Sequence, residues 1–347
     1  MHSKIKALIF GLGCLLLCCA LGCNRPRTST AVAAFYYWKT TFHLDKGQDT
    51  LLKKVAGNRL YLRFFDVVWD EQSQQAVPNA IVGIKENMKS LKVCPVVYLT
   101  NKTFEHTPLA KTDSLAFKVN ELVRKLAAAN QISYENVQLD CDWSLGTKES
   151  YFSFLKAFKK YSGKKLEATI RLHQVKYFAR TGVPPVDRGL LMFYNMGKIL
   201  PDLKAPNSIY NAADAAKYLN YLKNYILPLD VALPVFSWSL QIRSGKVIQV
   251  YAQIDRKELS DHSRFVHTGT KNVYQAIRSF YMDGIYIKRG DYFKFEEISP
   301  LTLDNAAKQL STHLAPLEKR NIIYYELSTI HLPEFQEKDF QEVSAHF

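Results

Sequence analysis

Two aspartates at the end of a short apolar strand are the first sign of chemistry in this chain. In the segment Asn136–Ser144 a period of two places the apolar side chains on one face and Gln138, Asp140 and Asp142 on the other. Two carboxylates on one face repel each other and are costly to bury without hydrogen bonds. The pair therefore fits the open mouth of a barrel, where polar groups gather around a ligand. The alternative is that both aspartates cap the following helix, a position that Asp favours.

Eight β-rich segments, most of them separated by helical segments, are expected to position this pair. We predict strands at Ala34–Phe42, Arg59–Trp69, Val93–Thr100, the segment with the two aspartates, Leu166–Leu172, Gly189–Asn195, Val231–Trp238 and Asn321–Leu327. We predict helices at Leu51–Asn58, Asp113–Asn130, Tyr151–Tyr161, Ala212–Leu227 and Leu303–Leu317. Alternating strands and helices form parallel sheets, and eight strands favour a closed (β/α)8 TIM barrel over an open doubly wound sheet.

Residues 240 to about 300 depart from this alternation. Short β-like runs there surround a helix expected near Lys271–Phe280, so we predict a small α+β insertion between strands seven and eight. A polar stretch around Gln72–Pro78 reads as a loop. Residues 34–347 are thus predicted to form one barrel with one insertion. No Gly-rich phosphate loop follows the first strand, which argues against a dinucleotide-binding or P-loop fold.

In such a barrel the carboxyl ends of all eight strands meet at one mouth. The polar and aromatic side chains that we expect to act there are Trp38, Asp66, Asp140, Asp142, Tyr194, Asn195, Trp238 and Glu326. Many of the 20 Tyr and 4 Trp of the chain fall at strand ends, which suggests surfaces that stack on sugar rings. Aromatic rings also fill hydrophobic cores, and any single one of them has that alternative role.

The composition indicates a folded and basic protein. Hydrophobic residues make up 47% of the chain, and 46 Lys and Arg stand against 32 Asp and Glu, for a net charge of +14. A basic balance can attract nucleic acid, anionic lipid or acidic glycans. The Lys and Arg are scattered in runs no longer than two, so we expect solvated faces and no nucleic-acid partner.

The pattern of residues at the N-terminus predicts a targeting segment. Lys4 and Lys6 precede an apolar run, Ala7–Leu21, that is too short and too rich in Cys and Gly for a membrane span. The following Gly22-Cys23 completes a segment that resembles the lipobox of bacterial lipoproteins, although Ala20 stands where Leu is commonest. The resemblance implies a signal peptide over residues 1–22 and a lipidated Cys23 with a tether over residues 23–33.

This resemblance also implies a location. The protein is expected in the bacterial cell envelope, held at a membrane by its lipid. Asn24, in place of Asp, implies sorting to the outer membrane if the host is Gram-negative.

Two cysteines remain beyond the lipidation site. Cys94 and Cys141 both fall inside predicted strands at helix-facing positions, so we expect two buried free thiols. The histidines are spread along the chain without the spacing of metal ligands, so we expect no metal site and no cofactor.

Four motifs of the chain are similar to those of family 18 glycoside hydrolases. The segment Leu139–Ser144 (LDCDWS) resembles the strand-four signature DGxDxDWE, and Met192–Asn195 (MFYN) resembles the strand-six motif MxYD/N. Leu233–Ser237 (LPVFS) is similar to the strand-seven LPFYG, and Tyr325–Leu327 (YEL) to the strand-eight WEL, with Tyr for Trp. The four motifs follow the order of the family from about residue 136 to 327. Many chitinases of the family also carry an insertion between strands seven and eight.

The resemblance implies roles for individual residues. Asp142 would position the N-acetyl group of the substrate, which itself attacks the anomeric carbon, and Asp140 would support Asp142. Tyr194 and Asn195 would contact the acetamide. The proton donor of the family falls on Ser144, whose hydroxyl has a pKa far too high for general-acid catalysis, worth about 10²–10⁴-fold in rate.

Three functions stay open at this point. The first is binding of a glycan, such as one that contains N-acetylglucosamine, without efficient hydrolysis. The second is an active glycosidase with a displaced acid, for which Glu149, Asp66 and Glu326 are the candidates. The third is an envelope scaffold without a sugar ligand. Arg171 would either touch the ligand or pair with Asp140 or Asp142.

Overall fold

Eight parallel strands close into a barrel in the computed structural model, which describes residues 30–252, 254–328 and 332–347. The strands are β1 (Thr30–Tyr37), β3 (Arg59–Asp70), β6 (Lys92–Leu99), β7 (Asn136–Asp140), β8 (Lys165–Arg171), β9 (Arg188–Met192), β10 (Leu229–Pro234) and β18 (Lys319–Tyr325). Because β1 pairs with both β18 and β3, the ring is closed. The predicted (β/α)8 fold class is confirmed.

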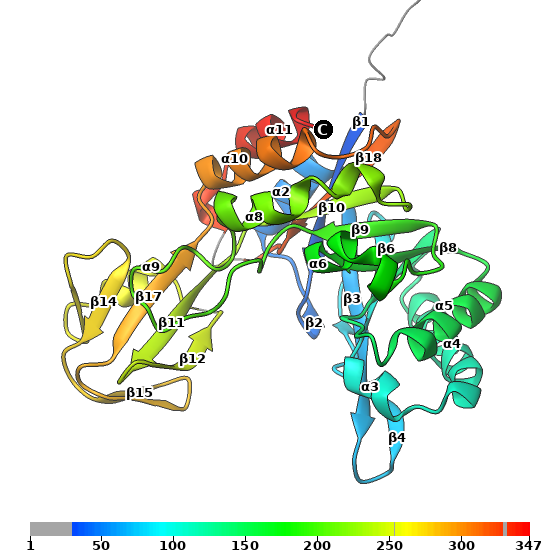
Figure 1. The fold of residues 1–347 in the computed structure, drawn as a ribbon, viewed down its shortest axis with the longest axis horizontal. Coiled ribbons are helices and arrows are strands. Elements are labelled where there is room, and N and C mark those ends of the chain that lie inside the picture. The colour runs from blue at the N-terminus through cyan, green and yellow to red at the C-terminus, as the bar shows by residue number, and fades with distance from the viewer. Residues whose placement is uncertain (1–29, 253, 329–331) are drawn as a thin grey trace, which may run out of the picture.

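Helices cover the outside of the barrel (Figure 1). The longer ones are α2 (Lys46–Ala56), α4 (Thr112–Ala129), α5 (Lys148–Ser162), α8 (Ala212–Leu219), α10 (Pro300–Ser311) and α11 (Glu337–Ala345). Short helices are α3 (Asn101–His106), α6 (Leu172–Lys176) and α7 (Phe178–Thr181). Apolar faces join the two layers: the ring of Phe340 in α11 lies 5.4 Å from Phe35 of β1 and 4.7 Å from Tyr324 of β18, between centroids.

A hairpin lies between the second and third barrel strands. The chain turns back from β3 into β4 (Gln75–Asn79), which pairs antiparallel with β3, so the loop expected around Gln72–Pro78 is in part a strand. Two short strands, β2 (Thr41–Phe42) and β5 (Gly83–Ile84), pair nearby. In Figure 1 this hairpin projects from the bottom of the barrel, to the right of the lobe described next.

Residues between β10 and α10 build a separate lobe, at the left of Figure 1. Its antiparallel sheet contains β11 (Ser237–Arg243), β12 (Lys246–Tyr251), β13 (Phe265–His267), β14 (Val273–Ala276) and β17 (Tyr292–Glu297), with α9 (Arg256–Leu259) and a hairpin of β15 (Phe280–Met282) and β16 (Ile285–Ile287). The helix expected near Lys271–Phe280 is wrong, because that segment forms β14 and β15. Its β-branched and aromatic residues pack well in a sheet, and β14 pairs on both of its edges.

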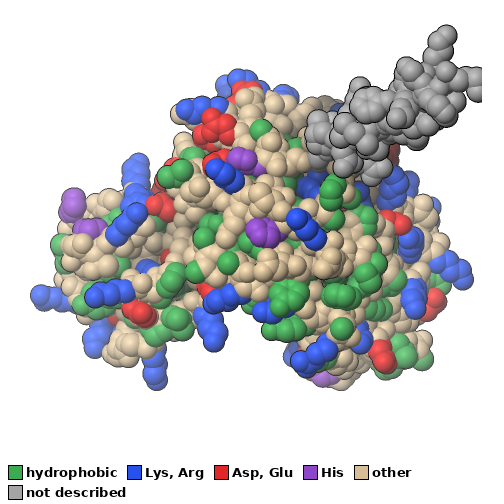
Figure 2. Space-filling model, turned by 45° about the horizontal axis from the view of Figure 1, so that its top comes forward, with side chains coloured by type: hydrophobic (Ala, Val, Ile, Leu, Met, Phe, Trp, Pro, Cys, Tyr) green, Lys and Arg blue, Asp and Glu red, His purple; other side chains and the backbone are tan. Residues whose placement is uncertain are grey.

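Charged side chains are spread over the face seen in Figure 2, where Lys and Arg stand singly or in small groups among apolar side chains. Within the described ranges, no helix is both long and apolar enough to cross a bilayer. The predicted signal peptide and Cys23 lie outside the described residues.

The two cysteines are buried free thiols, as expected. The side chains of Cys94 and Cys141 point in different directions, however. Cys94 points into the barrel, where its sulfur accepts a hydrogen bond from the Asn136 amide at 3.2 Å, so the helix-facing assignment is wrong for this residue. The strand alternation explains the direction, since Cys94 shares its parity on β6 with Tyr98, which also lines the interior.

A polar layer crosses the interior of the barrel. The Tyr36 hydroxyl donates to the Gln138 side-chain carbonyl. The Glu167 carboxylate accepts from the side chains of Asn136 (2.5 Å), Tyr61 (3.3 Å) and Gln138 (3.3 Å). Burial, together with the charge of Asp230, raises the pKa of Glu167 to about 7. The layer confirms that the polar side chains of the Asn136–Asp140 strand face inward.

Replacing Glu167 with Gln is expected to flatten the dependence of stability on pH. The pKa of Glu167 is about 7 in the folded protein against 4.5 for a free side chain, so the folded state holds its proton more tightly. Its contribution to stability is therefore complete below pH 4.5 and is lost as the pH rises to 7. Across this window the free energy of unfolding of the wild type should fall by about 2–3 kcal/mol more than that of E167Q. Urea unfolding at the two ends of this pH window measures the free energies. An equal fall in the free energy of unfolding for wild type and E167Q would contradict the prediction.

Candidate ligand-binding site

A pocket of about 330 Å³ opens where the barrel strands end. Its lining comes from β1, β3, β6, β7, β8, β9 and β18 and the residues that directly follow them: Tyr36, Trp38, Arg63, Asp66, Tyr98, Asp140, Asp142, Arg171, Met192, Tyr194, Asn195 and Tyr325. A concave site with aromatic walls and a few convergent polar groups is the usual form of a small-ligand site. The mouth of the barrel is therefore the candidate site.

The alternation of side chains along the strands directs most of these residues into the pocket, and a β-bulge in β3 directs the others. On β7, Gln138, Asp140 and Asp142 share one parity, and successive members reach from the barrel interior to the mouth. On β3 the register shifts between Arg63 and Phe65. A bulge of this kind re-aims side chains, and it lets Arg63 and Asp66 both line the pocket although they are three positions apart.

Asp142 is held by Arg171 at the solvent edge of the pocket. The guanidinium donates from Nε to one carboxylate oxygen at 2.6 Å and from Nη2 to the other at 2.7 Å. Burial opposes the charge of Arg171, but the hydrogen bonds and charge of Asp142 outweigh burial, so the pKa of Arg171 is raised. A bidentate pair fixes orientation as well as charge. The expected pairing of Arg171 with one of the two aspartates is thus observed, with Asp142 as the partner.

Asp140 lies deeper, and among the described residues no cation is bonded to it. Its carboxylate accepts a hydrogen bond from the Thr169 hydroxyl at 2.6 Å. Burial raises the pKa of Asp140 to about 6, against the lowering effect of Thr169 and with a further rise from the charge of Asp142. Asp140 therefore holds a proton in weakly acidic solution and is ionised above it, whereas Asp142 is tied to a permanent cation.

A second Arg–Asp pair supports the opposite wall. Arg63 bonds both carboxylate oxygens of Asp66, through Nε at 2.7 Å and through Nη2. Its remaining nitrogen donates to the backbone carbonyl of Trp38 at 3.2 Å, and the guanidinium carbon lies 5.5 Å from the centroid of the Trp38 ring. One arginine thus fixes both the carboxylate and the indole, the latter partly by cation–π attraction.

Aromatic rings form the remaining walls. Tyr194 and Tyr325 stack with centroids 5.5 Å apart and an angle of 23° between the rings. Trp38 meets Tyr325, Tyr36 and Tyr98 edge to face, at 5.8, 5.7 and 6.4 Å. Rings fixed in this way present flat apolar faces at little cost in conformational entropy.

Six of the eight predicted mouth residues line this pocket: Trp38, Asp66, Asp140, Asp142, Tyr194 and Asn195. The other two lie elsewhere. Trp238 belongs to β11, which leaves the barrel for the lobe, and its indole donates to Glu296 at 2.9 Å. The Glu326 carboxylate accepts from the backbone of Trp38, and burial raises the pKa of Glu326. Glu326 directly follows β18 and does not belong to the lining of this pocket.

Five residues of the lining were not predicted to belong to the site: Tyr36, Arg63, Tyr98, Met192 and Tyr325. Period-two alternation connects Tyr36 to Trp38 and would have indicated it. Arg63 lies before a bulge that alternation does not foresee.

Ser144 lies just outside the pocket lining. Its backbone N–H donates to the Thr147 hydroxyl at 2.9 Å and to the Asn101 side chain at 3.3 Å, and its own hydroxyl lies 3.2 Å from that of Thr147. Glu149 is exposed in the first turn of α5. The carboxyl groups that line the pocket are therefore Asp66, Asp140 and Asp142. Across the described ranges, no group of three His, Cys, Asp or Glu side chains could hold a metal ion.

The barrel is similar to solved enzyme structures at low sequence identity. The spore cortex-lytic enzyme SleL of Bacillus cereus aligns over 92% of this chain and 75% of its own, with 13% identity and a TM-score of 0.55. A chitinase of Rhizomucor miehei (RmChi1) aligns over 91% of this chain and 100% of its own, with 9% identity and a TM-score of 0.48. An endo-beta-N-acetylglucosaminidase of Cordyceps militaris aligns over 92% and 90%, with 10% identity and a TM-score of 0.43.

The similarity to SleL establishes the fold that the two chains share. No protein-family model matches this sequence, and no curated protein matches it.

Removing the Thr169 hydroxyl is expected to raise the pKa of Asp140 above its value of about 6, because that hydroxyl stabilises the carboxylate form. In Thr169→Val the pKa should rise by about one unit, the size of one hydrogen bond to a charged group. Carbon-13 NMR of the Asp140 carboxyl between about pH 4 and about pH 9 follows the titration. An unchanged or lower pKa in the variant would show that Thr169 does not stabilise the charge.

Proposed function

We propose that this protein binds a glycan at the barrel mouth without hydrolysing it efficiently. The observation that carries the proposal is one pocket in which fixed aromatic rings stand beside two Arg–Asp pairs, while a serine occupies the position of the proton donor in the family that the motifs resemble. The shared barrel fold and the order of the four motifs support a ligand of the carbohydrate class.

The pocket offers both kinds of contact that a sugar needs. The rings of Trp38, Tyr98 and Tyr325 present apolar faces to the carbon–hydrogen face of a pyranose, and the charged pairs present oxygens and N–H groups to its hydroxyls. Tyr194 lines the pocket and its ring stacks on Tyr325, so its hydroxyl is a polar group of this wall. This hydroxyl is available to an acetamide carbonyl, as the resemblance implies for the motif Met192–Asn195.

The pocket is poorly equipped for the chemistry. General-acid catalysis requires a group that gives up a proton near the working pH within reach of the leaving oxygen. Ser144 cannot do so, and the carboxylates of Asp66 and Asp142 are each held by an arginine through both oxygens. These pairs suit recognition better than proton transfer.

One observation favours a second candidate function, an active glycosidase. Asp140 lines the pocket and has a pKa of about 6, which matches the requirement for a general acid in weakly acidic solution. In this case Asp140 replaces the missing donor. The third possibility, an envelope scaffold, predicts no sugar binding at all.

We further propose that Cys23 is lipidated and that the protein is attached to the bacterial cell envelope, at the outer membrane in a Gram-negative host. The lipobox-like segment before Cys23 supports this location. Replacement of Cys23 with Ser should move the protein from the membrane fraction to the soluble fraction, and loss of the lipid mass from the N-terminal peptide should accompany the change.

Replacing the pocket tryptophan is expected to abolish most of the glycan affinity. Trp38→Ala removes a stacking wall and should weaken binding of N-acetylglucosamine oligomers by about 30-fold, equivalent to about 2 kcal/mol. Trp238→Ala is the matched control, because Trp238 lies outside the pocket on β11 and should leave affinity unchanged. Isothermal titration calorimetry measures both. Equal losses in the two variants would refute the pocket, and absence of binding by the wild type to any glycan would favour the scaffold.

Long incubation of the soluble chain, residues 24–347, with N-acetylglucosamine oligomers and N-glycans is expected to give no products detectable by mass spectrometry. Cleavage that disappears in Asp140→Asn would instead establish the second candidate, with Asp140 as the acid. The substitution keeps an acceptor for the Thr169 hydroxyl, so a loss of cleavage would come from the missing proton and not from a rearranged pocket.

A further inference from the structure

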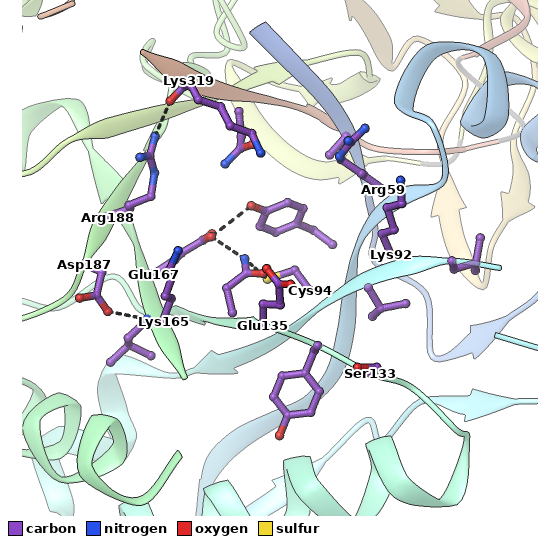
Figure 3. A pocket seen from close by; sticks show the side chains of 18 residues that line it. Arg59, Lys92, Cys94, Ser133, Glu135, Lys165, Glu167, Asp187, Arg188 and Lys319 are labelled. Carbon is purple, nitrogen blue, oxygen red and sulfur yellow. Dashed lines mark hydrogen bonds between the residues drawn. The ribbon is translucent and has the colours of Figure 1, made fainter. Parts of the chain in front are cut away.

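The opposite end of the barrel also contains a pocket, and it is larger. Its volume is about 570 Å³, and Figure 3 shows it from close by. The lining comes from the beginnings of β3, β6, β7, β8, β9 and β18 and the loops before them. In most barrels of this fold the interior is filled and this face serves stability. An open pocket of this size is therefore a feature that the fold alone does not require.

Five cations surround this pocket, each from the start of a different strand: Arg59, Lys92, Lys165, Arg188 and Lys319. In Figure 3, Arg59 and Lys92 lie on one side of the pocket and Arg188 and Lys319 on the other. Of these five cations, only Arg188 forms an ion pair with a described residue, Asp230, at 2.6 Å. Arg59 donates to the backbone carbonyl of Ala56 at 3.1 Å. Like charges gathered around one cavity repel each other, and the anions in the described part of the chain do not neutralise all five.

Three acidic residues also line the pocket, and they neutralise only part of the positive charge of the five cations. Asp187 is occupied by Lys159 at 2.6 Å and by the backbone N–H of Leu166 at 2.8 Å. Glu167 lies at the floor, where neutral groups bond it. Glu135 is exposed at the rim. Lys92, Lys165 and Lys319 have no ion-pair partner in the part of the chain that the structure describes.

The floor has a different character from the rim. Tyr61, Asn136 and Glu167 form a hydrogen-bonded group there, and Figure 3 shows the bonds that converge on the Glu167 carboxylate. Such groups can accept from and donate to hydroxyls. A cationic rim above a polar, hydroxyl-compatible floor is complementary to a molecule with an anion at one end and hydroxyls at the other.

We propose that this second pocket binds a phosphate ester of a small polyol, with the phosphate at the rim and the hydroxyls toward the floor. Several lysines and an arginine converging from separate strands suit the negative charge and the multiple oxygens of a phosphate group. Glycerol phosphate is the simplest compound of this class. It occurs free in solution as a monoester and, as a phosphodiester with one negative charge, in the headgroup of phosphatidylglycerol.

The geometry favours the lipid headgroup as the source. Thr30 begins β1 at this end of the barrel, paired with Lys319 of the rim. The residues between Cys23 and Thr30 can span at most about 25 Å when extended. This part of the inference relies on the proposed lipidation of Cys23, which would hold the rim close to a membrane surface. The glycan pocket at the other end would then face away from that membrane.

Binding is tested with the mature chain carrying Cys23→Ser, which keeps every described residue and has no lipid. Calorimetry with glycerol 3-phosphate measures the soluble ligand, and co-sedimentation with vesicles of phosphatidylcholine, with or without an equal part of phosphatidylglycerol, measures the headgroup. The rim variant is K92Q/K165Q/K319Q. The matched control is K118Q/K156Q/K160Q, which removes three exposed lysines from α4 and α5.

The rim variant should bind both the ester and the phosphatidylglycerol vesicles about 10- to 100-fold more weakly than the wild type, and the control should match the wild type. Glycerol 3-phosphate should also displace the protein from the vesicles. Equal losses in rim and control variants would overturn the site, because they would show general attraction to charge. Binding of the ester without binding of vesicles would keep the site and overturn the lipid source. Binding of neither would overturn the proposal.

A second variant keeps the test decisive if the triple substitution impairs folding. Glu167→Gln removes the negative charge at the floor and should strengthen binding of glycerol 3-phosphate several-fold above pH 7, while adsorption to a flat charged surface would change little. Unchanged affinity of E167Q would place the ester outside the pocket. Glycan binding by the rim variant should persist, because its three lysines lie at the other end of the barrel. Failure of this proposal is therefore separable from failure of the glycan function.

Discussion

The hydrogen-bonded layer inside the barrel is the constraint on which both pockets depend. Tyr36 of β1 donates to Gln138 of β7, and Gln138 donates to Glu167 of β8. This layer fills the interior between the strand ends, so each mouth has its own floor. The pocket at the carboxyl ends of the strands has Tyr36 in its lining, and the pocket at their beginnings has Glu167. A buried polar layer is favourable only when its members are satisfied, and the closed parallel register supplies partners from non-adjacent strands.

The same register gives two neighbouring aspartates different chemistry. Asp140 and Asp142 lie two positions apart on one face of β7 and its extension, yet their partners come from different positions of β8. Thr169 donates to the buried Asp140, and Arg171 binds the more exposed Asp142. Burial without a bonded cation raises the pKa of Asp140 to about 6. The division of roles follows from depth in the barrel, because each step of two residues moves a side chain outward toward solvent.

Sequence patterns predicted the parts of the structure that depend on local periodicity. The closed barrel follows from eight β-rich segments alternating with helices, and the placement of Asp140 and Asp142 follows from the two-residue period. Arg63 escaped because its direction depends on a bulge in β3, which has no clear local signal. Trp238 was expected at the mouth because a single β-like run continues through it, although the chain leaves the barrel after Pro234 and begins a new strand at Ser237. In both cases tertiary pairing, and not the side-chain pattern, decides the outcome.

The clustering of lysines around the second pocket is the feature that the sequence pattern predicts least well. Lys92, Lys165 and Lys319 are separated by long stretches of sequence and looked like solvated residues, since none belongs to a basic run longer than two. A parallel barrel places the first residues of all its strands at one end, so lysines that are isolated in sequence become neighbours around one opening. The same rule gathers the aromatic and acidic side chains at the carboxyl ends of the strands. The two pockets therefore differ in character because the strands begin with cations and end with rings and carboxylates.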